Sequence, residues 1–242
     1  MALSLLFEGL VKEIVINDLD PAIHAFWKST LQDSADFAER IRTVPLSPRE
    51  WRRQRQIYQH GARAGYRALG FAMFYLNRTN HSGIMNAGMI GGRDQLGEWK
   101  LDARFNRAEL VNRVEKIARF RDRIHVSGVD ALDCLKRYRR RADVLFYLDP
   151  PYFRAGRDLY MNAYRPDDHA NVRDAMVALK KPCVVSYDDV PQVRRLYSEL
   201  TARRLHLLHT ARTPRLGREV LFFSDGLRIP RKYRRSKVSR QD

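Results

Sequence analysis

The sequence is poor in cysteine and has no long apolar run. Its two cysteines, Cys134 and Cys183, belong to no Cys-x-x-Cys pair and no Cys/His cluster, which argues against a zinc site and against a disulfide framework. No apolar run approaches the roughly 20 residues of a membrane-spanning helix, and no basic region marks a signal peptide at the N-terminus. We therefore expect a cytoplasmic protein that has neither a metal nor a membrane partner.

Acidic residues are also scarce relative to basic ones. Lys and Arg number 45 against 28 for Asp and Glu, which gives a formal net charge of +17. Such an excess favours a polyanionic partner such as nucleic acid, because basic side chains that neutralise phosphates release counterions. A basic enzyme without a nucleic-acid role is the alternative that composition leaves open. Hydrophobic residues make up 44% of the chain, enough for one sizeable α/β core.

The order of apolar and turn residues predicts alternating helices and strands. A helix over residues 1–10 precedes a β-branched strand at 14–16, and Pro21 opens the next helix with Asp20 as its N-cap. Strands and helices alternate again after residue 113, and the last two strands are expected to form an antiparallel hairpin. This pattern is typical of an α/β fold with a mostly parallel sheet and an antiparallel last strand.

The segment between residues 31 and 113 interrupts this alternation. Helical stretches rich in Arg and aromatic residues are followed by the Gly- and Asn-rich run TNHSGIMNAGMIGGRDQLGEW, which predicts a loop or a hairpin. We interpret the segment as a largely helical insertion into the α/β domain.

The candidate catalytic residues are Asp149, Pro150, Pro151 and Tyr152, which directly follow an apolar strand. Two prolines cannot donate to a strand ladder, so the strand must end there, and ligands of open α/β sheets bind beyond the carboxyl ends of strands. The Asp149 carboxylate and the Pro150 carbonyl can accept the two N–H bonds of an aromatic amine, which localises the lone pair on nitrogen. Tyr152 can stack on a base that has left the duplex. A strand-ending Asp-Pro turn without chemistry is the alternative.

The DPPY run, together with INDLDP far upstream, resembles the Dam-like (class alpha) DNA adenine-N6 methyltransferases over Leu5 to Ser224. The resemblance implies a Rossmann-like, S-adenosylmethionine-dependent methyltransferase fold, S-adenosylmethionine as methyl donor, and double-stranded DNA as partner. It places the enzyme in a phage or a restriction-modification setting, and we expect a monomer. The implied domains are a discontinuous catalytic domain over 1–30 and 114–228, a target-recognition insertion over 31–113, and a basic tail over 229–242.

The resemblance also assigns residues that bind the cofactor. Asp18 corresponds to the acid that binds the ribose hydroxyls, Leu19 to the residue beside the adenine ring, and Asp130 to the acid that contacts the adenine amine. Two acceptor oxygens facing a ribose diol give the Asp18 role a physical basis. Asp18 also suits a helix N-cap, and Asp130 an ordinary turn. We expect His169 to be structural, because methyl transfer needs no general base before the displacement.

The stretch from Tyr75 to Gly83 resembles the hairpin with which the family reads DNA. Its candidate DNA-binding residues are Asn77, Arg78, His81 and Ser82. A solvated arginine at a helix end is the alternative for Arg78. Members that recognise GATC carry an aromatic residue where His81 stands and an arginine near Asn86, so the resemblance does not extend to GATC specificity.

The chain departs from the family at its start. Family members open with a Lys- and Gly-containing segment and a Phe-x-Gly-x-Gly loop on the first strand, both of which hold the cofactor, and neither is present. The resemblance therefore describes a family member that is apparently truncated at its N-terminus. Its missing first strand belongs centrally, between the strand at Ile14 and the strand at Val144, and its activity is expected to be poor. An rRNA base methyltransferase with the same DPPY chemistry and a non-catalytic nucleic-acid-binding remnant are the alternatives.

Overall fold

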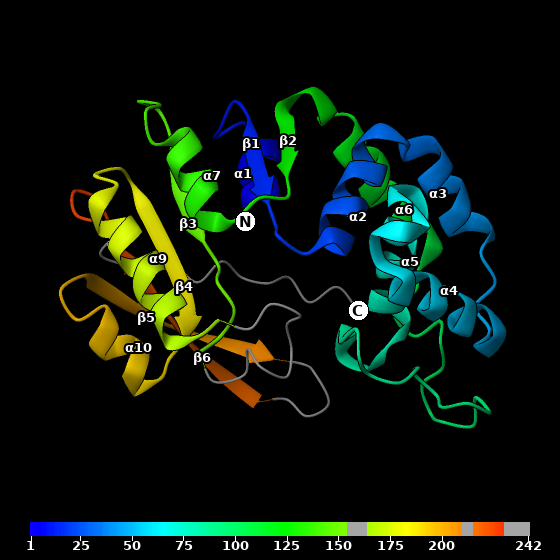
Figure 1. Ribbon diagram of the computed structural model, residues 1–242. Coiled ribbons are helices and arrows are strands. Elements are labelled where there is room, and N and C mark those ends of the chain that lie inside the picture. The colour runs from blue at the N-terminus through cyan, green and yellow to red at the C-terminus, as the bar shows by residue number, and fades with distance from the viewer. Residues whose placement is uncertain (154–163, 210–214, 230–242) are drawn as a thin grey trace. The chain divides into compact units, whose positions relative to one another are not determined.

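The computed structural model describes residues 1–153, 164–209 and 215–229, and the side chains among them except those of 206–217. The described chain divides into two compact units. One holds Met1–Arg137 with 208–209 and 215–216, and the other holds 138–153, 164–207 and 217–229. Each unit is described by itself below, with the element labels of Figure 1.

The first unit contains a pair of parallel strands. Strand β1 (Ile14–Asn17) follows helix α1 (Ala2–Phe7) and pairs with β2 (Ile124–Ser127), which follows the 3-10 helix η3 (Arg121–Arg123). Leu6 of α1 packs in one core cluster with Ile14 and Ile124. The predicted helix over residues 1–10 ends early, because Gly9 adopts a φ of 72°, a conformation that glycine takes at helix ends.

The rest of the first unit is helical. Its helices are α2 (Pro21–Gln32), α3 (Ser34–Thr43), α4 (Pro48–His60), η1 (Gly61–Ala64), α5 (Tyr66–Thr79), η2 (His81–Gly83), α6 (Arg107–Ala118) and the start of α7 (Ala131–Tyr138). As predicted, Asp20 caps α2 by accepting a hydrogen bond from the Ala22 amide at 2.7 Å.

Aromatic side chains form the core between these helices. The ring of Phe37 lies 5.3 Å from that of Phe74 and 5.4 Å from that of Phe71. Helices α2 and α5 approach closely at Gly70, where an added Cβ would stand 2.5 Å from the Ala25 carbonyl oxygen. A side chain larger than hydrogen at Gly70 would therefore force the two helix backbones apart.

The second unit holds a four-stranded sheet. Its elements are β3 (Phe146–Leu148), α9 (Pro166–Ala178), β4 (Cys183–Asp188), α10 (Pro191–Leu196), β5 (Thr201–His209) and β6 (Arg215–Phe223). The strand order is β3-β4-β6-β5, with β3 parallel and β6 antiparallel to β4.

The described elements confirm a mixed α/β fold with parallel strand pairs and an antiparallel strand. Among the described residues the strands form two sheets, β1-β2 and β3-β4-β6-β5. The contacts group β1 and β2 with the helical segment, so the predicted boundaries at residues 30/31 and 113/114 remain predictions. The turn between the last two strands and the basic tail beyond residue 229 lie outside the described residues.

Candidate active site

The turn that follows β3 carries the predicted catalytic residues. Phe146 and Pro150 are buried, whereas Asp149 between them in the chain is exposed. Pro150 and Pro151 offer no N–H groups, so the β3 ladder ends at Leu148, which pairs with Val185 of β4. The turn therefore presents a carboxylate at the carboxyl end of the parallel strand β3.

Side chains of the neighbouring strands fasten this turn. Ser186 of β4 lies with its Oγ 2.7 Å from Oδ1 of Asp149, and the Tyr152 hydroxyl donates to Oε1 of Glu219 on β6 at 2.8 Å. The amide of Phe153 donates to Oδ1 of Asp188 at 2.9 Å. Both ends of the turn are thus tied to the β4–β6 strand pair.

His169 of α9 packs against the same turn from within the core. It is 2% exposed, and its ring centroid lies 4.9 Å from that of Phe153. Its Nδ1 is 2.9 Å from the Tyr187 hydroxyl. Burial lowers the pKa of His169 and raises the pKa of Tyr187, so a neutral imidazole and a protonated Tyr187 hydroxyl share this hydrogen bond. This environment suits the structural role that the sequence predicts for His169.

The ends of β1 and β2 form a second polar edge, in the first unit. Asn17 pairs with Ser127 in the parallel register and accepts a hydrogen bond from its hydroxyl at 2.5 Å. The Asn17 amide also donates to the Val129 carbonyl at 2.9 Å and accepts from the Val129 amide at 3.2 Å. Asn17 therefore links the turn after β1 to the turn after β2. The sequence reading did not single it out.

The two predicted cofactor acids follow these adjacent strands. Asp18 is half-buried, its Oδ1 accepts from the Asp20 amide at 2.9 Å, and burial raises its pKa. The helix cap itself is Asp20, so the alternative of Asp18 as the N-cap is wrong. Asp130 is exposed and accepts from the Leu132 amide at 2.8 Å, the contact of an ordinary helix start. Leu19 is 48% exposed.

These residues fit part of an S-adenosylmethionine molecule. The carboxylates of Asp18 and Asp130 can accept hydrogen bonds from ribose hydroxyls and from an adenine amine. None of the described strand-to-helix turns carries a pair of glycines, and the one glycine after β2, Gly128, faces the ring of His24 at 3.2 Å from its would-be Cβ. Among the described residues, no group of three or more His, Cys, Asp and Glu is placed to hold a metal ion.

The turn after α5 carries the predicted DNA-binding residues. Asn80 is fully buried, and its Oδ1 accepts from Trp51 Nε1 at 2.7 Å while its Nδ2 donates to the Ile84 carbonyl at 2.8 Å. An isolated antiparallel bridge joins Asn80 to Met89. The run predicted as a loop or hairpin is thus a turn that is held by the buried Asn80 and by one antiparallel bridge.

His81 and Ser82 stand exposed on this turn, where Ser82 adopts a φ of 56°. Arg78 and Asn77 are instead held together, with Arg78 Nη2 donating to Asn77 Oδ1 at 2.6 Å. Burial and the nearby charges of Arg104 and Arg113 lower the pKa of Arg78. Arg78 is therefore half-buried among cations, and the alternative of a solvated arginine is wrong.

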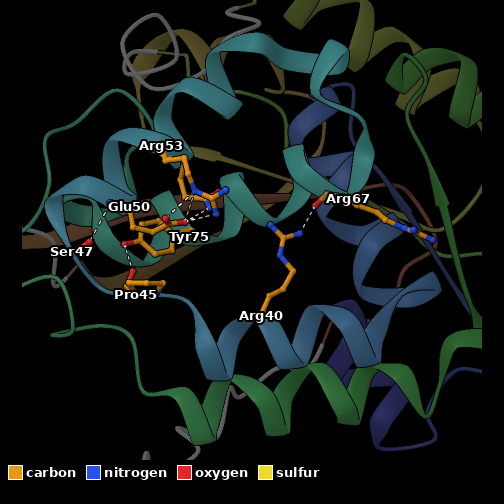
Figure 2. A network of polar contacts seen from close by, with 8 residues as sticks. Arg40, Pro45, Ser47, Glu50, Arg53, Arg67 and Tyr75 are labelled. Carbon is orange, nitrogen blue, oxygen red and sulfur yellow. Dashed lines mark hydrogen bonds and ion pairs between the residues drawn. The ribbon is translucent and has the colours of Figure 1, made fainter.

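A polar network fastens helix α4 beside this turn (Figure 2). Ser47 caps the helix by accepting from the Glu50 amide at 3.2 Å, and the buried Glu50 carboxylate binds Arg53 at 2.8 Å. The buried Tyr75 of α5 donates to the Pro45 carbonyl at 3.1 Å. Helix α4 thus turns Glu50, Trp51 and Gln54 inward. Three of its arginines, Arg49, Arg52 and Arg53, are exposed.

Comparison with curated proteins finds no match to the chain. The model of a family described as D12 class N6 adenine-specific DNA methyltransferase matches residues 2–213 of the 242. The matched range includes the β1–β2 edge with Asp18 and Asp130, the turn after α5, and the Asp149 turn. In the described residues no helix is both long and apolar enough to cross a membrane. The chain belongs to the D12 class of N6 adenine-specific DNA methyltransferases.

Proposed function

We propose that this protein transfers a methyl group from S-adenosylmethionine to N6 of adenine in double-stranded DNA, after the base has left the helix. The exposed Asp149 carboxylate on a turn that is tied to β4 and β6 is the observation that carries the proposal. An acceptor on a turn that is fixed by its hydrogen bonds is preorganised for a substrate amine, which lowers the cost of orienting the reacting groups.

The residues of the turn have separate tasks. The Asp149 carboxylate and the Pro150 carbonyl accept the two N–H bonds of the flipped adenine, which concentrates the lone pair on N6. The aromatic ring of Tyr152 stacks on the base. S-adenosylmethionine, when bound, supplies an electrophilic methyl group. The methyl group would pass to N6 as its bond to sulfur breaks, and the methylated N6 would lose one proton to water.

The helical segment of the first unit is proposed to hold the DNA. Exposed arginines at the surface of α4, Arg49, Arg52 and Arg53, suit phosphate contacts. His81 and Ser82 are exposed on the turn after α5, where they can reach base edges. Asn77 and Arg78 lie at the helix end just before that turn, and they are proposed to hold its conformation or to contact the DNA backbone.

The substrate class separates this proposal from its two alternatives. The family match favours DNA over rRNA. We expect residues 1–242, when preceded by a segment that supplies a strand and a Phe-x-Gly-x-Gly loop, to transfer tritiated methyl groups from S-adenosylmethionine to unmethylated duplex DNA and to leave protein-free rRNA unlabelled. Nuclease digestion and chromatography should recover the label as N6-methyladenine. Labelling of rRNA alone would favour the rRNA methyltransferase, and binding of DNA with no transfer would favour the non-catalytic remnant.

Trp51 is expected to support sequence discrimination through Asn80. Trp51→Phe removes the donor to the buried Asn80 Oδ1, which should lower the free energy of unfolding by about 1–3 kcal/mol. It should also make the enzyme less selective among DNA sequences, because the proposed base-reading residues His81 and Ser82 follow Asn80 directly. Denaturant unfolding and sequencing of modified adenines measure the two effects. Trp27→Phe on α2 is the matched control, and an unchanged site preference in Trp51→Phe would show that Asn80 does not position the turn.

A further inference from the structure

A buried hydroxyl lies directly behind the Asp149 carboxylate. Ser186 is 2% exposed, and its Oγ stands 2.7 Å from Oδ1 of Asp149 and 3.1 Å from the hydroxyl of Tyr147. The register explains this placement, because Leu148 at the end of β3 pairs with Val185, the residue before Ser186. Backbone pairing of two parallel strands thus fixes the serine beside the residue that follows Leu148.

The direction of these hydrogen bonds follows from the groups involved. An ionised carboxylate can only accept, so Ser186 donates its one hydrogen to Asp149. The Tyr147 hydroxyl must then donate to Ser186 Oγ. Burial raises the pKa of Tyr147, so this hydroxyl keeps its hydrogen at neutral pH. The result is a directed chain from Tyr147 through Ser186 to Asp149.

We infer that Ser186 is a positioning residue for methyl transfer, an inference that rests on the proposed function. Its hydrogen bond occupies Oδ1 of Asp149 and restrains rotation of the exposed carboxylate. The second oxygen, Oδ2, is then the one that faces the substrate amine. Charge-assisted hydrogen bonds of this kind are short and directional. Ser186 itself touches neither the base nor the methyl group, and acts only through Asp149.

Two substitutions isolate the hydroxyl. Ser186→Thr keeps the hydroxyl, and Ser186→Val replaces it by a methyl group of nearly the same shape. Both add one methyl group at a buried strand position, and both residues favour strands. A difference in rate between the two variants therefore measures the effect of the hydroxyl and not that of the added volume. We expect the single-turnover rate of methyl transfer to be about 10- to 100-fold lower in Ser186→Val than in Ser186→Thr, with equal affinity for DNA.

Ser224→Ala is the matched control on the same strand pair. The Ser224 hydroxyl accepts from the Cys183 amide at 2.9 Å and donates to the Lys181 carbonyl at 3.0 Å, at the opposite end of β4 from Asp149. Its loss should lower stability without changing the rate of transfer. A merely structural role of Ser186 would make Ser186→Val behave like Ser224→Ala.

The rates of the Ser186 variants are compared in an active polypeptide that keeps Asp149, after Asp149→Ala has been shown to abolish transfer in that same polypeptide. Equal rates for the Thr and Val variants there would overturn the role of Ser186 and leave the proposed function standing. Full activity of Asp149→Ala would overturn the proposed function itself.

A measurement without turnover gives a second test on residues 1–242. The ¹³C carboxyl resonance of Asp149, assigned with Asp149→Asn, should differ between the Thr and Val variants and stay unchanged in Ser224→Ala. Ser186→Ala, which adds no atom, gives the same comparison against the unsubstituted chain if the larger side chains prevent folding. If the ¹³C chemical shift of the Asp149 carboxyl does not change when the Ser186 hydroxyl is removed, the inference is overturned.

Discussion

Replacing Asp149 by alanine should abolish methyl transfer to adenine and leave binding of DNA nearly unchanged. The substitution removes the carboxylate acceptor that localises the N6 lone pair, and the Pro150 carbonyl alone cannot receive both N–H bonds. Loss of one preorganised polar group at a reacting centre typically costs about 10²–10³ in rate. The loss here is expected to reach the upper end or exceed it, because the nucleophile itself becomes weaker. The measurement is single-turnover transfer of labelled methyl groups to duplex DNA.

The structure of the Asp149 region indicates that the variant will fold. Asp149 is exposed, and the Ser186 hydroxyl has a second acceptor in the Leu148 carbonyl at 3.4 Å. Asp143→Ala is a suitable control, because Asp143 is another exposed aspartate just before β3 and pairs only loosely with Arg141 at 3.8 Å. Transfer should survive in that variant. An Asp149→Ala enzyme that methylates adenine at the full rate would disprove the catalytic assignment.

The features that the sequence predicts well are those whose cause is local. The strand at Ile14, the cap at Asp20 and the end of β3 before Pro150 each follow from residues within a few positions of one another. Gly9 belongs with these local features, because glycine readily takes the positive φ with which α1 ends after Phe7.

The features that the sequence missed depend on partners far along the chain. Ser186 lies 37 residues from Asp149, and in the run KPCVVSYDD it resembles any small strand residue. Asn80 and Trp51 are 29 residues apart, so their hydrogen bond cannot be inferred without the structure. A polar residue that interrupts an apolar strand just before a catalytic edge is the one signal that could have drawn attention to Ser186.

The close packing of α2 against α5 is a further case. Most of α2 lies before the predicted boundary at residue 30/31 and α5 lies after it, and Gly70 brings their backbones together within one compact unit. Helix-to-helix packing of this kind depends on the absence of a side chain at one position. Periodicity identifies each helix, but it does not identify the helix against which it packs.

Residues 1–242 by themselves should bind S-adenosylmethionine only weakly, with a dissociation constant of about 1 mM or higher, which corresponds to roughly −4 kcal/mol. Asp18 and Asp130 at the β1–β2 edge are the proposed acceptors for the ribose hydroxyls and the adenine amine. The methyl-bearing half of the molecule needs a backbone that approaches it closely, a role that glycine fills most easily. No described strand-to-helix turn provides such a glycine pair.

Strand pairing supports the same expectation. Among the described residues, β1 pairs only with β2 and β3 only with β4, so each has one edge without a partner strand. Backbone N–H and C=O groups that are buried without a partner cost about 1–3 kcal/mol each. A segment that supplies a strand and a Phe-x-Gly-x-Gly loop ahead of residue 1 is therefore expected to raise both stability and cofactor affinity.

Calorimetry on two polypeptides tests this prediction. Residues 1–242 alone should give little heat with S-adenosylmethionine, and the same residues behind such a segment should bind it at micromolar concentrations. Asp18→Ala in the longer polypeptide is the control, because it should remove the gain by deleting the ribose acceptor while leaving the added loop in place. The longer polypeptide should also unfold at a higher temperature, since the added strand would satisfy backbone groups at the unpaired edge of β1. Micromolar binding by residues 1–242 alone would show that their own turns suffice to hold the methyl donor.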